Sequence, residues 1–236
     1  MDRSTALITG LFGSFAVSSF LMLLVPQAQL GALQPQAVAE EGQPGRYSDI
    51  YPARNDATGQ GRAVYIQEGC IYCHSQQVRD PHLGSDLARG WGARRTVARD
   101  YLYESPALLG SQRLGPDLSN VGSPDWRNEN KDDLKKPAKR DSAWHYLHLY
   151  APRVVHQESN HPSYRYLFDE RKIAGQRSVE ALNLASDQVE AGMEVVPGPA
   201  AKALITYLRS LDRTHELAEA KGPAGPATAA TAPAAK

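Results

Sequence analysis

Two cysteines and a histidine lie in one five-residue run, Cys70-Ile71-Tyr72-Cys73-His74, and the sequence has no other cysteine. Thiols at this spacing can add to the two vinyl groups of a haem, and the adjacent imidazole can then bind its iron. A thioredoxin-like redox pair would need a βαβ pattern around the motif, and half of a zinc site would need a second pair of ligands. Neither is found, so the motif predicts one covalently attached haem c.

The elements that must position this motif are predicted to be helices. Residues 59–68 have a helical pattern that ends just before the motif. Residues 200–211 carry apolar side chains at helical spacing after a Pro-Gly-Pro break, which predicts a stronger amphipathic helix. Turns dominate between them, and no convincing strand is found. We therefore expect an all-α haem domain over residues 56–214.

The N-terminal segment, residues 1–27, is predicted to be a transmembrane anchor. Residues 4–39 contain no charged side chain, and residues 6–26 are mostly apolar over about the 20 residues that span a bilayer. The alternative is a cleaved signal peptide, for which residues 37–39 offer an Ala-x-Ala pattern. Arg3 and the N-terminal amine favour an N-terminus inside and the bulk of the chain outside.

The remaining segments look like connections. Residues 28–55 are predicted to be a linker, and the Ala- and Pro-rich residues 215–236 a disordered tail. Residues 128–141 mix charges of both signs and are expected to form a solvated loop or insertion, whose role the sequence does not give. The 236 residues carry 26 Lys+Arg and 26 Asp+Glu, a balance that argues against nucleic-acid binding. Two cysteines also exclude a disulfide scaffold.

Three runs together give a specific resemblance. Residues 61–76, which include the haem motif and end in Cys-Ile-Tyr-Cys-His-Ser-Gln, form the first run, and residues 111–118 (SQRLGPDL) and 162–167 (PSYRYL) the other two. Together they resemble subunit II of cbb3-type cytochrome c oxidase, a membrane-anchored cytochrome c with one haem. The resemblance implies that Pro116 accepts a hydrogen bond from the imidazole that binds the iron. Arg113 beside it is a candidate partner for a haem propionate, because a guanidinium pairs well with carboxylates, or it is a plain surface arginine.

The same resemblance implies a fold, a function and partners. The fold would be an all-α, class I cytochrome c-like domain with extended loops on a single transmembrane helix. The function would be electron transfer toward the oxygen-reducing haem–copper subunit, without catalytic residues of its own. The partners would be this integral-membrane subunit and other cytochrome c subunits or donors, with the haem domain outside the cytoplasmic membrane.

The distal ligand of the haem is the point at which the sequence departs from this family. Family members usually have methionine before the Pro-Ser-Tyr of the third run, and here that position is His161. Imidazole also binds haem iron, so His161 is the first candidate beside the proximal His74. Met193 is the alternative, unless another side chain or none binds. His145 and His148, three residues apart, are interpreted as packing or surface residues.

Two further functions remain open from the sequence. An independent anchored cytochrome c, or the small subunit of a nitric-oxide reductase, would use the same haem chemistry in another setting. A haem-based ligand sensor belongs to another class and would need a labile or vacant distal position.

Overall fold

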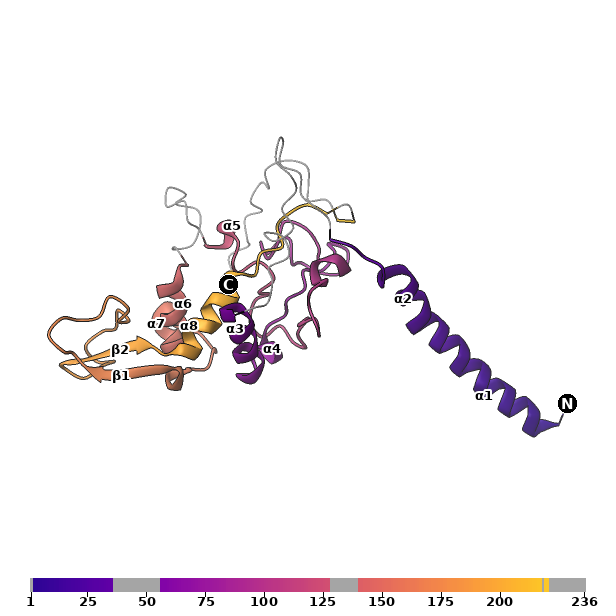
Figure 1. Ribbon diagram of the computed structural model, residues 1–236, viewed down its shortest axis with the longest axis horizontal. Coiled ribbons are helices and arrows are strands. Elements are labelled where there is room, and N and C mark those ends of the chain that lie inside the picture. Colours follow the sequence, from indigo (N-terminus) through magenta and orange to yellow (C-terminus); the bar gives the residue numbers. More distant parts are fainter. Residues whose placement is uncertain (1, 36–55, 128–139, 218, 221–236) are drawn as a thin grey trace.

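The computed structural model describes residues 2–35, 56–127, 140–217 and 219–220. Most of the predicted linker (36–55), most of the charged insertion (128–139) and the end of the predicted tail (221–236) lie outside the described residues. Figure 1 shows a long N-terminal helix that extends away from the rest of the chain.

The N-terminal helix runs without a break from Arg3 to Leu30 and is apolar enough to cross a membrane. It consists of α1 (Arg3–Ser19), a π-helical turn η1 (Phe20–Leu24) and α2 (Val25–Leu30). Pro26 has no backbone N–H to donate and its ring crowds the preceding turn, which accounts for the wider π-helical turn just before it. None of its apolar window is buried against the chain. The helix extends three residues beyond the predicted end of the anchor at residue 27.

The haem-motif domain is organised by two helices from opposite ends of its sequence, α3 (Asp56–Gln67) and α8 (Pro199–Arg209). They pack directly on one another, as Figure 1 shows. Gly61 lies so close to α8 that an added Cβ would be 1.9 Å from the carbonyl oxygen of Ala203. Next to this crossing, the rings of Tyr65 and Tyr207 lie 5.5 Å apart, and both are buried. The two predicted helices are therefore the centre of the core.

The stretch of chain between α3 and α8 contains several short helices. The motif itself forms one turn, α4 (Cys70–Cys73), directly after α3. The others, in chain order, are η2 (Ala98–Tyr101), α5 (Pro124–Arg127), α6 (Ser142–Tyr150), α7 (Pro152–Val155) and η3 (Arg165–Leu167). Asp141, at the end of the predicted charged loop, caps α6 by accepting a hydrogen bond of 3.0 Å from the backbone N–H of Trp144.

A two-stranded sheet corrects the all-α prediction. Strand β1 (Phe168–Lys172) pairs antiparallel with β2 (Met193–Pro197), in a register that sets Phe168 opposite Pro197. Four of the five side chains of β1 are exposed, whereas Val195 and Val196 of β2 are buried. The described part of the chain is therefore rich in helix with one small sheet, which Figure 1 shows at the opposite side of α8 and α3 from α4.

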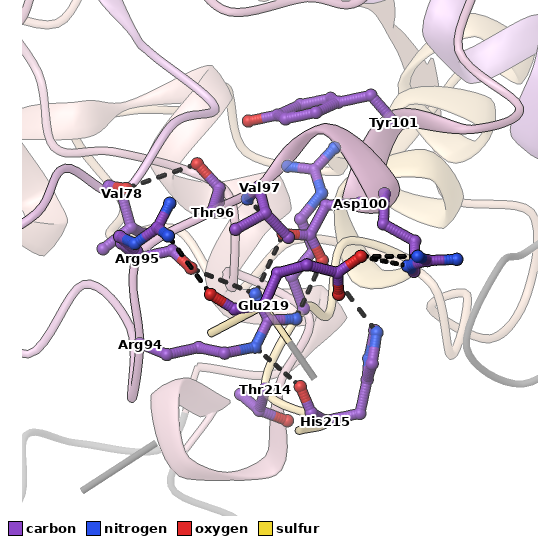
Figure 2. A network of polar contacts seen from close by, with 12 residues as sticks. Val78, Arg94, Arg95, Thr96, Val97, Asp100, Tyr101, Thr214, His215 and Glu219 are labelled. Atoms are coloured by element: carbon purple, nitrogen blue, oxygen red, sulfur yellow. Dashed lines mark hydrogen bonds and ion pairs between the residues drawn. The ribbon is translucent and has the colours of Figure 1, made fainter. Parts of the chain in front are cut away.

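The chain after α8 packs onto the domain, so the predicted tail began too early. Leu217 is only 1% exposed. Arg94, also buried, donates to the carbonyl oxygen of His215 at 2.7 Å and forms a two-bond ion pair with Asp100 at 2.8 and 2.9 Å. Figure 2 shows this network, which Glu219 joins through Arg99. Residues 215–217 and 219–220 therefore belong to the folded domain.

Candidate functional site

The two thiols and the proximal imidazole are brought together by a single helical turn. Gly69, with φ of 74°, adopts a left-handed conformation that ends α3 and lets α4 begin at once. Cys70 and Cys73 then lie one turn apart, both as free, partly buried thiols, and His74 leaves the turn in an extended conformation. Burial raises the pKa of the Cys70 thiol to about 12. The single turn thus keeps both thiols and the imidazole within five consecutive residues.

His74 is held by the segment that the resemblance pointed to. Its Nδ1 lies 2.8 Å from the carbonyl oxygen of Pro116, so Nδ1 carries the proton and Nε2 keeps its lone pair. Gly115 lies against the ring: an added Cβ would be 2.2 Å from Cε1. Gly110, with φ of 86°, approaches the carbonyl of His74 in the same way. Burial lowers the pKa of His74, which keeps the imidazole neutral.

His161 lies opposite His74. The centres of the two imidazole rings are 6.2 Å apart and their planes are tilted by 48°. Nδ1 of His161 lies 2.8 Å from the carbonyl oxygen of Pro162, so this ring also keeps Nε2 for another partner. Burial, with the nearby His74, lowers the pKa of His161 as well. Two neutral imidazoles therefore lie close together, each with Nδ1 bonded to a proline carbonyl.

This geometry fits a haem iron between the two rings. Imidazoles that bind one metal ion from opposite sides at about 2.0 Å have ring centres roughly 6 Å apart. The measured 6.2 Å agrees with this arrangement. Within the described ranges, no group of three or more His, Cys, Asp or Glu side chains could hold a metal ion. Two thiols and two opposed imidazoles thus form a donor set that suits a porphyrin with its own iron.

Met193 lies in the small sheet. It begins β2, where its backbone pairs with Lys172 of β1. In Figure 1 the β1–β2 hairpin and α4 lie on opposite sides of α8 and α3. The structure therefore brings His161 to His74, whereas Met193 belongs to the small sheet.

Arg113 is already paired within the protein. Its guanidinium forms an ion pair with Asp86 at 2.5 Å and also donates to the carbonyl oxygen of Gln77. Burial raises the pKa of Asp86, but hydrogen bonds from Arg79 and Arg113 outweigh this effect and lower the pKa to about 2. The site thus has an ionised carboxylate that holds Arg113, three residues before Pro116 in the same run.

The backbone that follows the motif is fastened by residues that the sequence did not single out. The carbonyl oxygen of Gln76 accepts hydrogen bonds from the hydroxyl of Tyr101 at 2.6 Å and from Arg213 at 3.3 Å. Arg213 is buried and forms an ion pair with Glu104 at 2.6 Å. No local pattern marks these residues, because they are far apart in the sequence and meet only in the folded chain.

The histidine pair of α6 divides into two different environments. His145 is buried beside Trp126 and Trp144 and fits the packing role that was expected. His148 contacts the imidazole of His161: the two ring centres lie 4.5 Å apart. Its position in the sequence gave no signal of this contact.

The comparisons agree with the geometry. A family model described as cytochrome c oxidase, mono-heme subunit/FixO matches residues 50–195, more than half of the chain. A comparison with curated proteins found no match. The matched range contains the thiol pair, His74 and His161. With a membrane-anchoring helix before it and one haem motif within it, this chain belongs to the FixO family, the mono-haem cytochrome c subunits of cbb3-type oxidases.

Proposed function

We propose that the chain carries electrons toward the oxygen-reducing subunit through a haem c with two axial histidines, His74 and His161. Cys70 and Cys73 would form the thioether bonds to this haem. The observation that carries the proposal is the opposition of the two imidazoles, with ring centres 6.2 Å apart. The α3–α8 crossing supports a class I cytochrome c-like arrangement around them.

The residues around the haem would orient it rather than take part in acid–base chemistry. When bound, the haem supplies a reversible one-electron iron couple. Pro116 and Pro162 hold the proton of each imidazole on Nδ1, which would leave both Nε2 atoms free to bind the iron. Arg113, held by Asp86, is the proposed cation for a propionate. The buried apolar core, to which α3 and α8 contribute, would limit the access of water from that side.

Replacement of the family's methionine by His161 has a consequence for the potential. A methionine ligand raises the potential of a haem relative to a second histidine. We therefore infer that this haem is a stronger reductant than a His/Met haem in the same position. Transfer toward an oxygen-reducing centre remains downhill.

The proposed location of the haem domain is the outer side of the cytoplasmic membrane. Support comes from Arg3 and the N-terminal amine, which favour an inside N-terminus. The proposed partners are the integral-membrane catalytic subunit and a cytochrome c that donates electrons. A ligand sensor would need a vacant distal position, and the opposed His161 argues against that function.

The test compares two variants of the full-length protein in detergent. In His161→Ala, the low-spin optical and EPR spectra of the ferric haem should be lost, because one axial nitrogen is removed. In Met193→Leu both spectra should stay as in the unmodified protein. The reverse result, with His161→Ala unchanged and Met193→Leu altered, would make Met193 the ligand and overturn the proposal.

A further inference from the structure

We propose that Trp144 and His148 of α6 form a buttress that fixes the ring plane of His161 and thereby keeps the distal side of the haem closed to other ligands. Both are positioning residues, since they act through His161. The proposal rests on the proposed function, in which His161 binds the iron.

The distal imidazole needs such support because its own hydrogen bond is local. Nδ1 of His161 is bonded to the carbonyl of Pro162, the next residue in the chain. The corresponding bond of His74 reaches Pro116, 42 residues away. A bond to an adjacent residue moves with the loop, so it does not by itself fix the ring relative to the domain.

The loop that carries His161 is docked on the end of α6. The backbone N–H of Tyr164 donates to the carbonyl of Leu149 at 2.8 Å, and the hydroxyl of Ser163 donates to the carbonyl of Tyr150. Leu149 and Tyr150 are buried in the core. Helix α6 is therefore the platform on which the distal loop lies.

The side chains of the same helix continue this platform to the distal ring. The ring centre of His148 lies 4.5 Å from that of His161, with a tilt of 45° between the ring planes. Trp144, one turn earlier, stacks on His148 with ring centres 5.0 Å apart and planes only 7° from parallel. Three rings thus lie in sequence from α6 to the distal ligand, and movement of His161 toward α6 is blocked.

Packing against the rings of Trp144 and His161 holds His148 without a hydrogen bond at its Nδ1. Its Nδ1 is buried, and no hydrogen-bond partner for this atom exists among the residues that the structure describes. A phenyl ring would keep the contact with Trp144 and His161 and would remove the unpartnered nitrogen. We therefore expect Phe at this position to act as His does, whereas Ala would leave a gap beside the distal ring.

The helix itself has little freedom to move. Asp141 caps its first turn at 3.0 Å, and Ser142 accepts a hydrogen bond from Arg209 of α8 at 2.5 Å. Trp126 packs edge-on against Trp144 at 5.7 Å. The buttress is therefore fastened to the same core as α8.

The test uses the full-length haem protein with His148→Ala, His148→Phe and Trp144→Phe, and with His156→Ala as control. His156 is an exposed histidine of the same region. The readouts are the EPR g-values of the ferric haem, which depend on the orientation of the axial rings, and the rate at which cyanide displaces the distal ligand.

Mutation of residues that orient a metal ligand commonly changes the binding of that ligand by about 10- to 100-fold. His148→Ala should shift the g-values and speed cyanide binding by about tenfold or more, and His148→Phe and Trp144→Phe should keep values near those of the control.

Two results would overturn the buttress. The first is a His148→Ala protein with g-values and a cyanide rate equal to those of His156→Ala. The second is a His148→Phe protein that behaves like His148→Ala, since that would assign the effect to the nitrogen atoms. Both results are measured in proteins that keep His161. If His161 were not the ligand, the spectra of His161→Ala would show it. Failure of the buttress can therefore be distinguished from failure of the proposed function.

Discussion

Gly115 lies directly against the imidazole of His74, so close that a Cβ on residue 115 would be 2.2 Å from Cε1 of that ring. The next residue, Pro116, accepts the hydrogen bond from Nδ1. The absence of a side chain at residue 115 therefore allows the ring to reach the carbonyl that orients it.

Gly115→Ala should displace the proximal ring and lengthen its bond to Pro116. Because such overpacking typically costs about 1–3 kcal/mol, we expect a lower midpoint of thermal unfolding together with a weaker proximal bond to the iron. Thermal unfolding followed by haem absorbance measures the first effect, and the ferric spectrum the second. The control is Gly13→Ala, where a new Cβ would have no atom within 4 Å, and it should change neither. Equal behaviour of the two variants would contradict the prediction.

His161→Met should raise the midpoint potential, because methionine in place of a second histidine favours ferrous iron. The change should fall within the roughly 0.8 V over which axial ligands set haem potentials. A redox titration of the full-length protein measures it, with Met193→Leu as the matched control that leaves the potential unchanged. An unaltered potential in His161→Met would be inconsistent with a ligand at residue 161.

The buried Asp86 should make stability depend on pH in the acid range. Burial opposes its ionisation, but hydrogen bonds from Arg79 and Arg113 lower its pKa to about 2, below the value of about 3.9 in an unfolded chain. The native state thus binds fewer protons, and the stabilisation is present above about pH 4 and is lost as the pH falls toward 2.

Asp86→Asn should therefore be less stable than the unmodified protein at neutral pH, by an amount that shrinks by about 1–2 kcal/mol between pH 4 and pH 2. Urea unfolding of both proteins at several pH values measures this difference. Asp187→Asn, at an exposed aspartate, serves as the control. A constant deficit across the range would exclude a role for ionisation.

The parts of the fold that the sequence predicted are those that local information determines. The spacing of Cys70, Cys73 and His74 needs only one helical turn, and the structure has that turn as α4. The helix predicted at 200–211 is found at Pro199–Arg209, because its apolar spacing and the preceding break lie within the segment itself. The position of His161 in its run led to its choice as first candidate, and it lies opposite His74, while its role as a ligand stays a prediction.

The parts that were missed depend on contacts between distant segments. Strand β1 has the sequence Phe-Asp-Glu-Arg-Lys, which has no alternation of apolar and polar residues, and it becomes a strand only by pairing with β2. Leu217 is one apolar residue in a polar stretch, and it is buried because Arg94 holds the backbone of His215. His148 gains its contact with His161 only when the distal loop docks on α6.

The crossing of α3 and α8 gives the sharpest prediction for stability. In an exposed helix, replacing glycine by alanine stabilises by about 1 kcal/mol, because alanine loses less backbone entropy. At Gly61 the sign should be reversed, since the new Cβ would be 1.9 Å from the carbonyl oxygen of Ala203 and the helices would have to separate. That separation also loosens the contact between Tyr65 and Tyr207.

Gly61→Ala should accordingly destabilise the domain by about 1–3 kcal/mol or more, as overpacked cores do. Chemical denaturation of the haem-loaded protein measures this loss. The control is Ala63→Gly on the exposed side of the same helix, which should cost about 1 kcal/mol through helix propensity alone. Stabilisation by Gly61→Ala would mean that α3 behaves as a free helix and does not pack closely on α8, and the core described above would then be wrong. If Gly61→Ala destabilised the domain more than Ala63→Gly, the stability of the haem domain would depend on the close approach of α3 and α8 at Gly61.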